Sequence, residues 1–206
     1  MSDRYPGFDL WAQRDSASWN AQTRAVIEER LRLSWEPQFF GPEEWRTLLA
    51  VCDRIVPRPG GRPRLAAAVL VDRKMAADKG DGYRDARLPP MQEAWRRGLR
   101  AVDAEAMAAH AQTFAALKGA DQDALLRAVQ AGHARTPVWG DMPPALFFQD
   151  RVLHDVVAAY YAFPAAWEEI GFGGPASPRG YVRMGFNRRD PWEGVEAPLK
   201  RRRHAG

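Results

Sequence analysis

The sequence predicts an all-α fold: a single helical domain with extended, proline- and glycine-rich arms at both ends. Of the 206 residues, 46% are hydrophobic, which is enough to fill one core. Apolar residues recur at three- and four-residue spacing in several segments, and no two segments alternate convincingly as paired strands. We therefore expect an N-terminal arm at 1–17, a helical domain at 18–170, and an extended C-terminal arm at 171–206 with a basic tail.

The boundaries of the N-terminal arm and of the first helix are predicted from a capping residue and from prolines. Residues 1–17 are polar and aromatic and contain Pro6 and Gly7, which favours an extended arm. Ser18 can cap a helix that begins near Trp19, and Pro37 ends that stretch.

The clearest helix is predicted in FFGPEEWRTLLAVCDRIVPRP, at 39–59. Pro42 suits a first helical turn, and Glu43 and Glu44 suit the positive end of the helix dipole. Apolar residues at helical spacing predict one buried stripe, namely Trp45, Leu48, Leu49, Cys52, Ile55 and Val56. The single cysteine lies within this stripe, so a buried and inert thiol is expected.

The middle of the chain predicts three more helices. One covers about 65–79, a second covers about 91–117 with a break near Asp103, and a short third begins at Asp121. Gly132 suits the end of the third helix.

The longest apolar helix is expected at 145–163, at the centre of the core. Leu146, Leu153, Val157 and Tyr160 fall on one of its faces. Pro164 ends this helix or begins another turn that carries Trp167 and Ile170.

Catalytic and metal-binding patterns are weak. His110, His133, His154 and His204 do not have the spacing of a zinc site. His154 and Asp155 are adjacent on a helix and should point about 100° apart, so we expect no dyad between them. A core or interface histidine is the favoured interpretation of His154; a small helical enzyme that uses His154 or His110 is the alternative.

Residues 171–193, GFGGPASPRGYVRMGFNRRDPWE, show no helical period and cannot form a core alone. Arginines alternate with aromatic residues, a mixture that suits a nucleic-acid module or a protein interface. Asp190 and Glu193 favour the protein interface. The predicted partner-binding residues are Gly171, Gly173, Gly174, Pro175, Pro178, Arg179, Gly180, Tyr181, Arg183, Arg188, Arg189, Asp190 and Trp192. Trp11 and Trp19 are candidates for a second such arm, and packing of the C-terminal arm on its own domain is the other interpretation.

Two segments resemble a known family. FFGPEEWRTLLAVCDRIVPRP is similar to the opening helix of the gluconate 2-dehydrogenase subunit 3 family, and YYAFPAAWEEIGFGGPASPRGYVR is similar to its closing signature. The resemblance covers roughly residues 39–185. It implies a small helical subunit without a redox centre, which accompanies a large FAD-containing dehydrogenase of the glucose–methanol–choline class. In some complexes of this family a cytochrome c subunit is also present.

The resemblance therefore implies a non-catalytic accessory subunit that helps a sugar or alcohol dehydrogenase to fold, to take up flavin or to be exported. No cofactor, metal or nucleic acid is expected in this chain. The sequence contains no run of eighteen apolar residues, so we expect no membrane insertion. The first residues do not have the pattern of a signal peptide. We expect a cytoplasmic protein, or a periplasmic one only if the partner carries it across the membrane.

Overall fold

The computed structural model describes residues 4–56, 65–177, 180, 185, 188–190 and 192–198. Within these ranges the chain folds into helices joined by turns and irregular segments, and no strand is formed. A single isolated parallel bridge joins Trp19 to Ser177. The expected all-α fold is confirmed.

The chain divides into two compact units. One comprises residues 34–160, and the other combines both chain ends, residues 1–33 and 161–206. These units do not coincide with the arm boundaries expected at 17 and 170, because helix α1 (Ala21–Leu31) groups with the chain ends.

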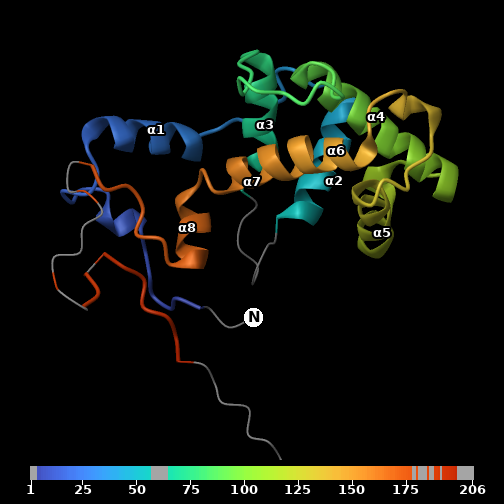
Figure 1. Cartoon of the computed structure of the whole chain (residues 1–206). Helices are drawn as coiled ribbons and strands as arrows, with labels where there is room; N and C mark the ends of the chain where they lie inside the picture. Colours follow the sequence, from blue (N-terminus) through green and yellow to red (C-terminus); the bar gives the residue numbers. More distant parts are fainter. Residues whose placement is uncertain are drawn as a thin grey trace, which may run out of the picture. The chain divides into compact units, whose positions relative to one another are not determined.

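The unit at 34–160 contains most of the helices (Figure 1). In chain order they are α2 (Pro42–Ile55), α3 (Ala67–Ala76), α4 (Met91–His110), the 3₁₀ turn η3 (Phe114–Ala116), α5 (Gly119–Gln130), the 3₁₀ turn η4 (Pro137–Trp139), α6 (Pro144–Phe147), η5 (Phe148–Leu153) and α7 (His154–Tyr160). Helix α2 packs on α3, α4 and α5, and α7 packs on α3.

Helix α2 begins as the sequence predicts. Pro42 occupies its first turn, and the Glu44 carboxylate accepts a hydrogen bond from the Gly41 backbone at 3.2 Å. Leu48 and the free thiol of Cys52 are buried, as expected. The other buried residues of α2 are Thr47 and Val51, whereas the rest of the predicted stripe is only partly buried, namely Trp45, Leu49, Ile55 and Val56. The residues before α2 are held by Asp72 of α3. This buried carboxylate accepts three backbone N–H groups, those of Gln38, Phe39 and Phe40, at 2.6–3.0 Å.

The core of this unit is built around Trp95 of α4. Its ring packs edge-to-face against Phe147 of α6 and Phe40, with centroids 5.6 and 6.3 Å apart. Gly98 lies one turn further along α4, directly beneath the Phe147 ring. A Cβ atom at this position would lie 2.1 Å from Phe147 Cζ, so only glycine allows α4 and α6 to come this close.

The predicted break of α4 at Asp103 does not occur. Helix α4 runs without interruption from Met91 to His110, and the Asp103 carboxylate instead accepts a hydrogen bond from the Phe114 backbone at 2.8 Å. Asp103 therefore lies within a helix and fixes the start of η3. From the sequence alone, an aspartate with this role looks the same as one that marks the end of a helix.

The predicted long apolar helix is divided. Figure 1 shows α6 and α7 following one another in a single run, but η5 between them is a π-helix. Six residues, Phe148–Leu153, form this wider turn, which brings Arg151 into the buried surface. The run ends at Tyr160, three residues before the expected end.

The second unit contains η1 (Trp11–Gln13), α1 and α8 (Pro164–Ile170). Asn20, and not Ser18, caps α1: its side chain accepts the Thr23 N–H at 2.8 Å. Leu10, Trp19 and Ile27 form the buried cluster, with Phe8, Trp11 and Trp167 packed on it. Trp19 is thus a core residue of its own chain, and its assignment to a partner-binding arm was wrong.

Candidate functional site

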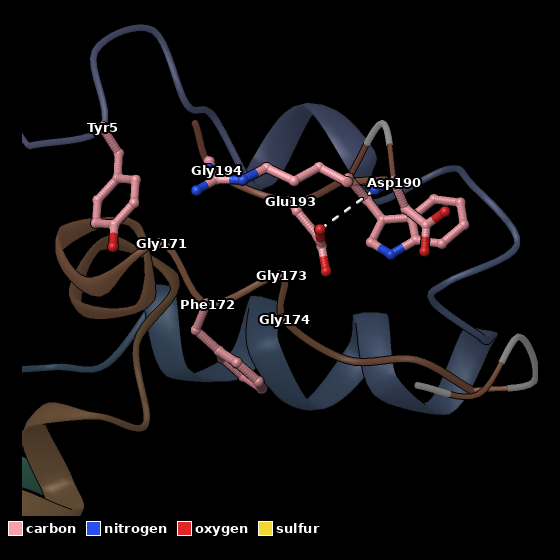
Figure 2. Close-up of a pocket in the computed structure, with 10 residues that line it drawn as sticks. Tyr5, Gly171, Phe172, Gly173, Gly174, Asp190, Glu193 and Gly194 are labelled. Atoms are coloured by element: carbon pink, nitrogen blue, oxygen red, sulfur yellow. Dashed lines mark hydrogen bonds between the residues drawn. The ribbon is translucent and has the colours of Figure 1, made fainter. Parts of the chain in front are cut away.

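Most of the predicted partner-binding residues that the structure describes surround one pocket in the unit of the chain ends (Figure 2). The pocket has a volume of about 330 Å³, and its glycine-rich wall follows directly after α8. Six predicted residues line it, namely Gly171, Gly173, Gly174, Arg189, Asp190 and Trp192. Figure 2 places the Tyr5 ring on one side and Asp190 with Glu193 on the other.

The glycines of this wall are required by close packing within the chain. Gly171 ends α8 in the left-handed region, with φ 67°, and a Cβ there would lie 2.4 Å from the Tyr5 ring. Gly174 has φ 73°, and its Cβ would lie 2.7 Å from Leu10. Both positions therefore combine a backbone conformation that favours glycine with a contact that excludes a side chain. For these two residues, packing on the chain's own N-terminal segment accounts for the glycine.

Polar side chains close the opposite wall. The Arg189 guanidinium donates to the Gly194 carbonyl at 2.6 Å, and the Asp190 N–H donates to Glu193 Oε2 at 3.2 Å. The Asp190 side chain is buried, whereas Arg189 is exposed. The pocket is thus lined by one guanidinium, two carboxylates and three aromatic side chains, together with glycine backbone, a composition common at protein interfaces.

A second groove shares Phe172 with this pocket. Gly173 and Gly174 donate no backbone hydrogen bond to the described part of the chain, whereas the Ser177 N–H binds the Ser18 carbonyl at 3.1 Å. The second groove, of about 380 Å³, includes Val26, Trp167, Phe172 and Pro175 in its lining.

The remaining predicted site residues fall elsewhere. Pro178, Arg179, Tyr181 and Arg183 lie outside the described residues. Arg188 is exposed, Gly180 is partly buried, and Pro175 lines the second groove. The sequence interpretation missed Tyr5, Phe172, Glu193 and Gly194 as lining residues of the first pocket. Of these four residues, only Phe172 could have been found from the sequence, because it lies between the predicted glycines. Tyr5 is far from them in the sequence and belongs to no motif.

A second group of polar residues surrounds Asp155 in the other unit. The Asp155 carboxylate is fully buried and accepts hydrogen bonds from Trp95 Nε1 at 2.7 Å and Lys74 Nζ at 2.8 Å. His154 Nδ1 lies 3.1 Å from Asp155 Oδ1, although 57% of the His154 side chain is exposed. The expectation that these neighbours point apart and form no pair was therefore wrong: the imidazole contacts the adjacent carboxylate at the junction of η5 and α7.

Ion pairs extend this group to the surface. Lys74 Nζ lies 2.6 Å from Asp81, and Arg151 Nη1 lies 3.0 Å from Asp81 and 3.7 Å from Asp155. Partial burial opposes ionisation of Asp81 and of Lys74. The hydrogen bonds within the network outweigh this effect, so the pKa of Asp81 lies below its usual value and that of Lys74 above it.

Oxygen and nitrogen atoms of Asp81, His154 and Asp155 lie within 4.8 Å of one another, a spacing that could hold a metal ion. The donor set fits a metal poorly, however. Both carboxylates already bind Lys74, and a divalent cation would have to sit beside this ammonium and the Arg151 guanidinium. The arrangement therefore serves as an ion-pair network that joins α3, η5 and the segment between α3 and α4.

Comparison with known proteins identifies one family. The family model described as gluconate 2-dehydrogenase subunit 3 matches residues 42–174, well over half of the chain. The match begins at the first residue of α2 and ends at Gly174 in the pocket wall. No curated protein and no solved structure matched the chain. None of the helices in the described ranges has the length and apolar character needed to cross a bilayer. The chain belongs to the gluconate 2-dehydrogenase subunit 3 family.

Proposed function

We propose that this chain is a non-catalytic accessory subunit that binds and stabilises a large FAD-dependent sugar or alcohol dehydrogenase of the glucose–methanol–choline class. The observation that carries the proposal is the family match over residues 42–174, since the family is described as a subunit of gluconate 2-dehydrogenase. Catalysis and the flavin belong to the large subunit in this proposal. A cytochrome c is the natural third component where electrons leave through a haem.

The pocket and groove of the unit of chain ends supply a surface for such a partner. Their linings combine arginine with aromatic residues, and Phe172 lines both. Large partners that bind permanently bury such mixed surfaces, with aromatic and arginine side chains contributing most of the affinity. Arg179 and Tyr181, which the sequence predicts to bind the partner, lie outside the described residues.

The test is affinity capture from cells that make both subunits, with this chain as bait and flavin absorbance measured in the eluate. We expect a yellow eluate that contains the large subunit in a fixed ratio to the bait. A colourless eluate with the bait alone would contradict the proposal. So would turnover, or steeply salt-dependent nucleic-acid binding, by the purified chain.

A matched pair of variants tests the surface itself. Phe172→Ala removes a ring shared by the pocket and the groove and should reduce the amount of captured flavoprotein. Met107→Ala removes an equally apolar and half-exposed side chain from the last turn of α4, and should leave capture unchanged. If both variants capture the same amount of flavoprotein, this surface is not part of the interface.

A further inference from the structure

A cavity of about 650 Å³ lies between the start of α2 and the middle of α4, within the unit at 34–160. It is larger than the pocket in the unit of the chain ends, and its volume is in the range of small-molecule sites. Six of its lining residues are ionisable, three arginines and three acids, and the buried side chain of Leu99 forms part of its wall.

One acid and one arginine of this lining neutralise each other. Arg100 donates to Glu44 Oε1 through Nε at 3.0 Å and through Nη2 at 2.9 Å. The other oxygen of Glu44 accepts the Gly41 N–H at 3.2 Å. Both oxygens of this carboxylate are therefore used within the chain, and the pair closes one side of the cavity without offering a net charge to a ligand.

The side chain of Thr47 lines the cavity with a hydroxyl that has no partner. Thr47 is only 1% exposed, and its hydroxyl makes no hydrogen bond with the described residues. Buried polar groups in folded proteins are nearly always hydrogen-bonded, either to the protein or to a molecule that fills the neighbouring space. The Thr47 hydroxyl therefore indicates a ligand with a polar group in this cavity.

Arg96 supplies a cation that is already held in position. Its guanidinium lies over the Phe39 ring, 4.2 Å from the centroid, and its Nη2 donates to the Phe39 carbonyl at 2.9 Å. The Nε and Nη1 groups of Arg96 donate no hydrogen bond to the part of the chain that the structure describes. A guanidinium fixed in this way, with N–H groups to spare, suits a carboxylate.

Asp103 supplies the opposite charge further along the same helix. It follows Arg96 by seven residues, which corresponds to about 10 Å along an α-helix. Its Oδ1 accepts the Phe114 N–H at 2.8 Å, whereas its Oδ2 has no hydrogen-bond partner among the described residues. The α4 wall thus carries a guanidinium at one position and a carboxylate two turns later, and Thr47 lies on the facing helix.

From this arrangement we propose that the cavity is a binding site for a small zwitterion, an ω-amino acid whose carboxylate binds Arg96 and whose ammonium group binds Asp103. The Thr47 hydroxyl hydrogen-bonds the bound molecule, and its methylene chain lies against Leu99. A simple anion or a simple cation would leave one of the two charged positions without a counter-charge, whereas a molecule with separated opposite charges satisfies both. No residue of the unit of the chain ends takes part, so the site does not depend on that unit binding a flavoprotein.

The test is a titration of the purified, ¹⁵N-labelled full chain, followed by the NMR shifts of its backbone amides. The three probes are γ-aminobutyrate, butyrate and butylamine, which carry both charges, the carboxylate alone and the ammonium alone. We expect γ-aminobutyrate to bind with a Kd of about 1 mM or below, which is within reach of a ligand of this size. Butyrate and butylamine should each bind at least about tenfold more weakly, because each lacks one charge-assisted contact.

Two variants separate binding from folding. Thr47→Val keeps the shape but removes the unpartnered hydroxyl, so it should weaken γ-aminobutyrate binding about threefold or more without lowering the melting temperature. Asp103→Asn keeps an oxygen for the Phe114 N–H and removes the charge, so it should abolish the preference for γ-aminobutyrate over butyrate. Thr23→Val, in α1 and outside the cavity, is the control and should bind as wild type does.

Three results would overturn the site. One is the absence of a saturable shift with γ-aminobutyrate at concentrations of about 10 mM, tenfold above the expected Kd. Another is binding of butyrate or butylamine as tight as that of γ-aminobutyrate, which would show a single-charge contact only. The third is unchanged binding of γ-aminobutyrate in both Thr47→Val and Asp103→Asn.

Discussion

The two compact units of this chain are stabilised by different means. Residues 34–160 pack long amphipathic helices around Trp95 and Phe147, and add a fully buried carboxylate at Asp155 with its cationic partners. In its described residues, the unit of the chain ends has two short α-helices and a small buried cluster of Leu10, Trp19 and Ile27. Its segments are joined largely by contacts between irregular stretches, such as the salt bridge from Arg4 to Glu196 at 2.8 Å.

Glycine shows the difference most clearly. In the helical unit, Gly98 has an ordinary helical backbone and is required only because Phe147 lies against it. In the other unit, Gly171 and Gly174 are required both by close neighbours and by positive φ angles. A helix face fixes its contacts through periodic side chains, whereas an irregular stretch depends on individual backbone conformations. The second unit should therefore be the one that opens more easily.

The largest expected effect is that of Gly98→Ala. The added methyl group meets the Phe147 ring, which is enclosed by Trp95 and Trp139 and has little room to move. We expect a loss of about 1–3 kcal/mol in the free energy of unfolding, as for other overpacked cores. Urea titration followed by tryptophan fluorescence measures it. Gly80→Ala, where a Cβ meets no atom within 4 Å, is the control and should be close to neutral.

The second prediction concerns Gly174→Ala. It combines a φ of 73° with a contact to Leu10, so the unit of the chain ends should lose about 1–2 kcal/mol. Gly7→Ala has a similar φ of 74° and no neighbour within 4 Å, so the difference between the two isolates the contact. Hydrogen exchange should show faster opening of α1 with no change in α4. Equal acceleration in both helices would show that the units unfold together.

The smallest expected effect is a pH dependence from Asp81. Its folded-state pKa lies below the ordinary value of 3.8, so its charge stabilises the fold above that pH, and the contribution disappears as the pH falls through the lowered value. Asp81→Asn should cost less than about 1 kcal/mol near neutral pH, because the pair is partly exposed and screened by solvent. The difference from wild type should shrink below about pH 4. Urea titrations of both proteins from pH 3 to pH 7 measure it, and a constant difference over this range would contradict the prediction.

Periodicity predicted the helical unit well. The proline start of α2 was found where the local sequence placed it, whereas the buried face of this helix follows the predicted stripe only at Leu48 and Cys52. The π-helix was missed because a wider turn changes the hydrogen bonding without changing the apolar pattern. The contact between His154 and Asp155 was also missed, because the expected angle of about 100° between their side chains holds for a regular α-helix.

The candidate pocket was only half predictable. The glycines and Trp192 are conspicuous in the sequence, and six of the predicted residues lie together in the lining, whereas their neighbours Phe172, Glu193 and Gly194 were not singled out. Tyr5 joins them from the opposite end of the chain. No local pattern encodes such a pairing, since it depends on which irregular stretches meet after the helices have formed. The partner itself remains a proposal that rests on the family and on the chemistry of this surface.

The π-helical turn also constrains how this sequence can change in length. A wider turn is equivalent to one residue inserted into an α-helix, and losing a residue from Phe148–Leu153 would restore the regular winding. Every later position of the helix would then rotate by about 100°, and Asp155 would turn away from Trp95 and Lys74. A single-codon deletion in this stretch would therefore separate the buried carboxylate from Trp95 and Lys74 at once.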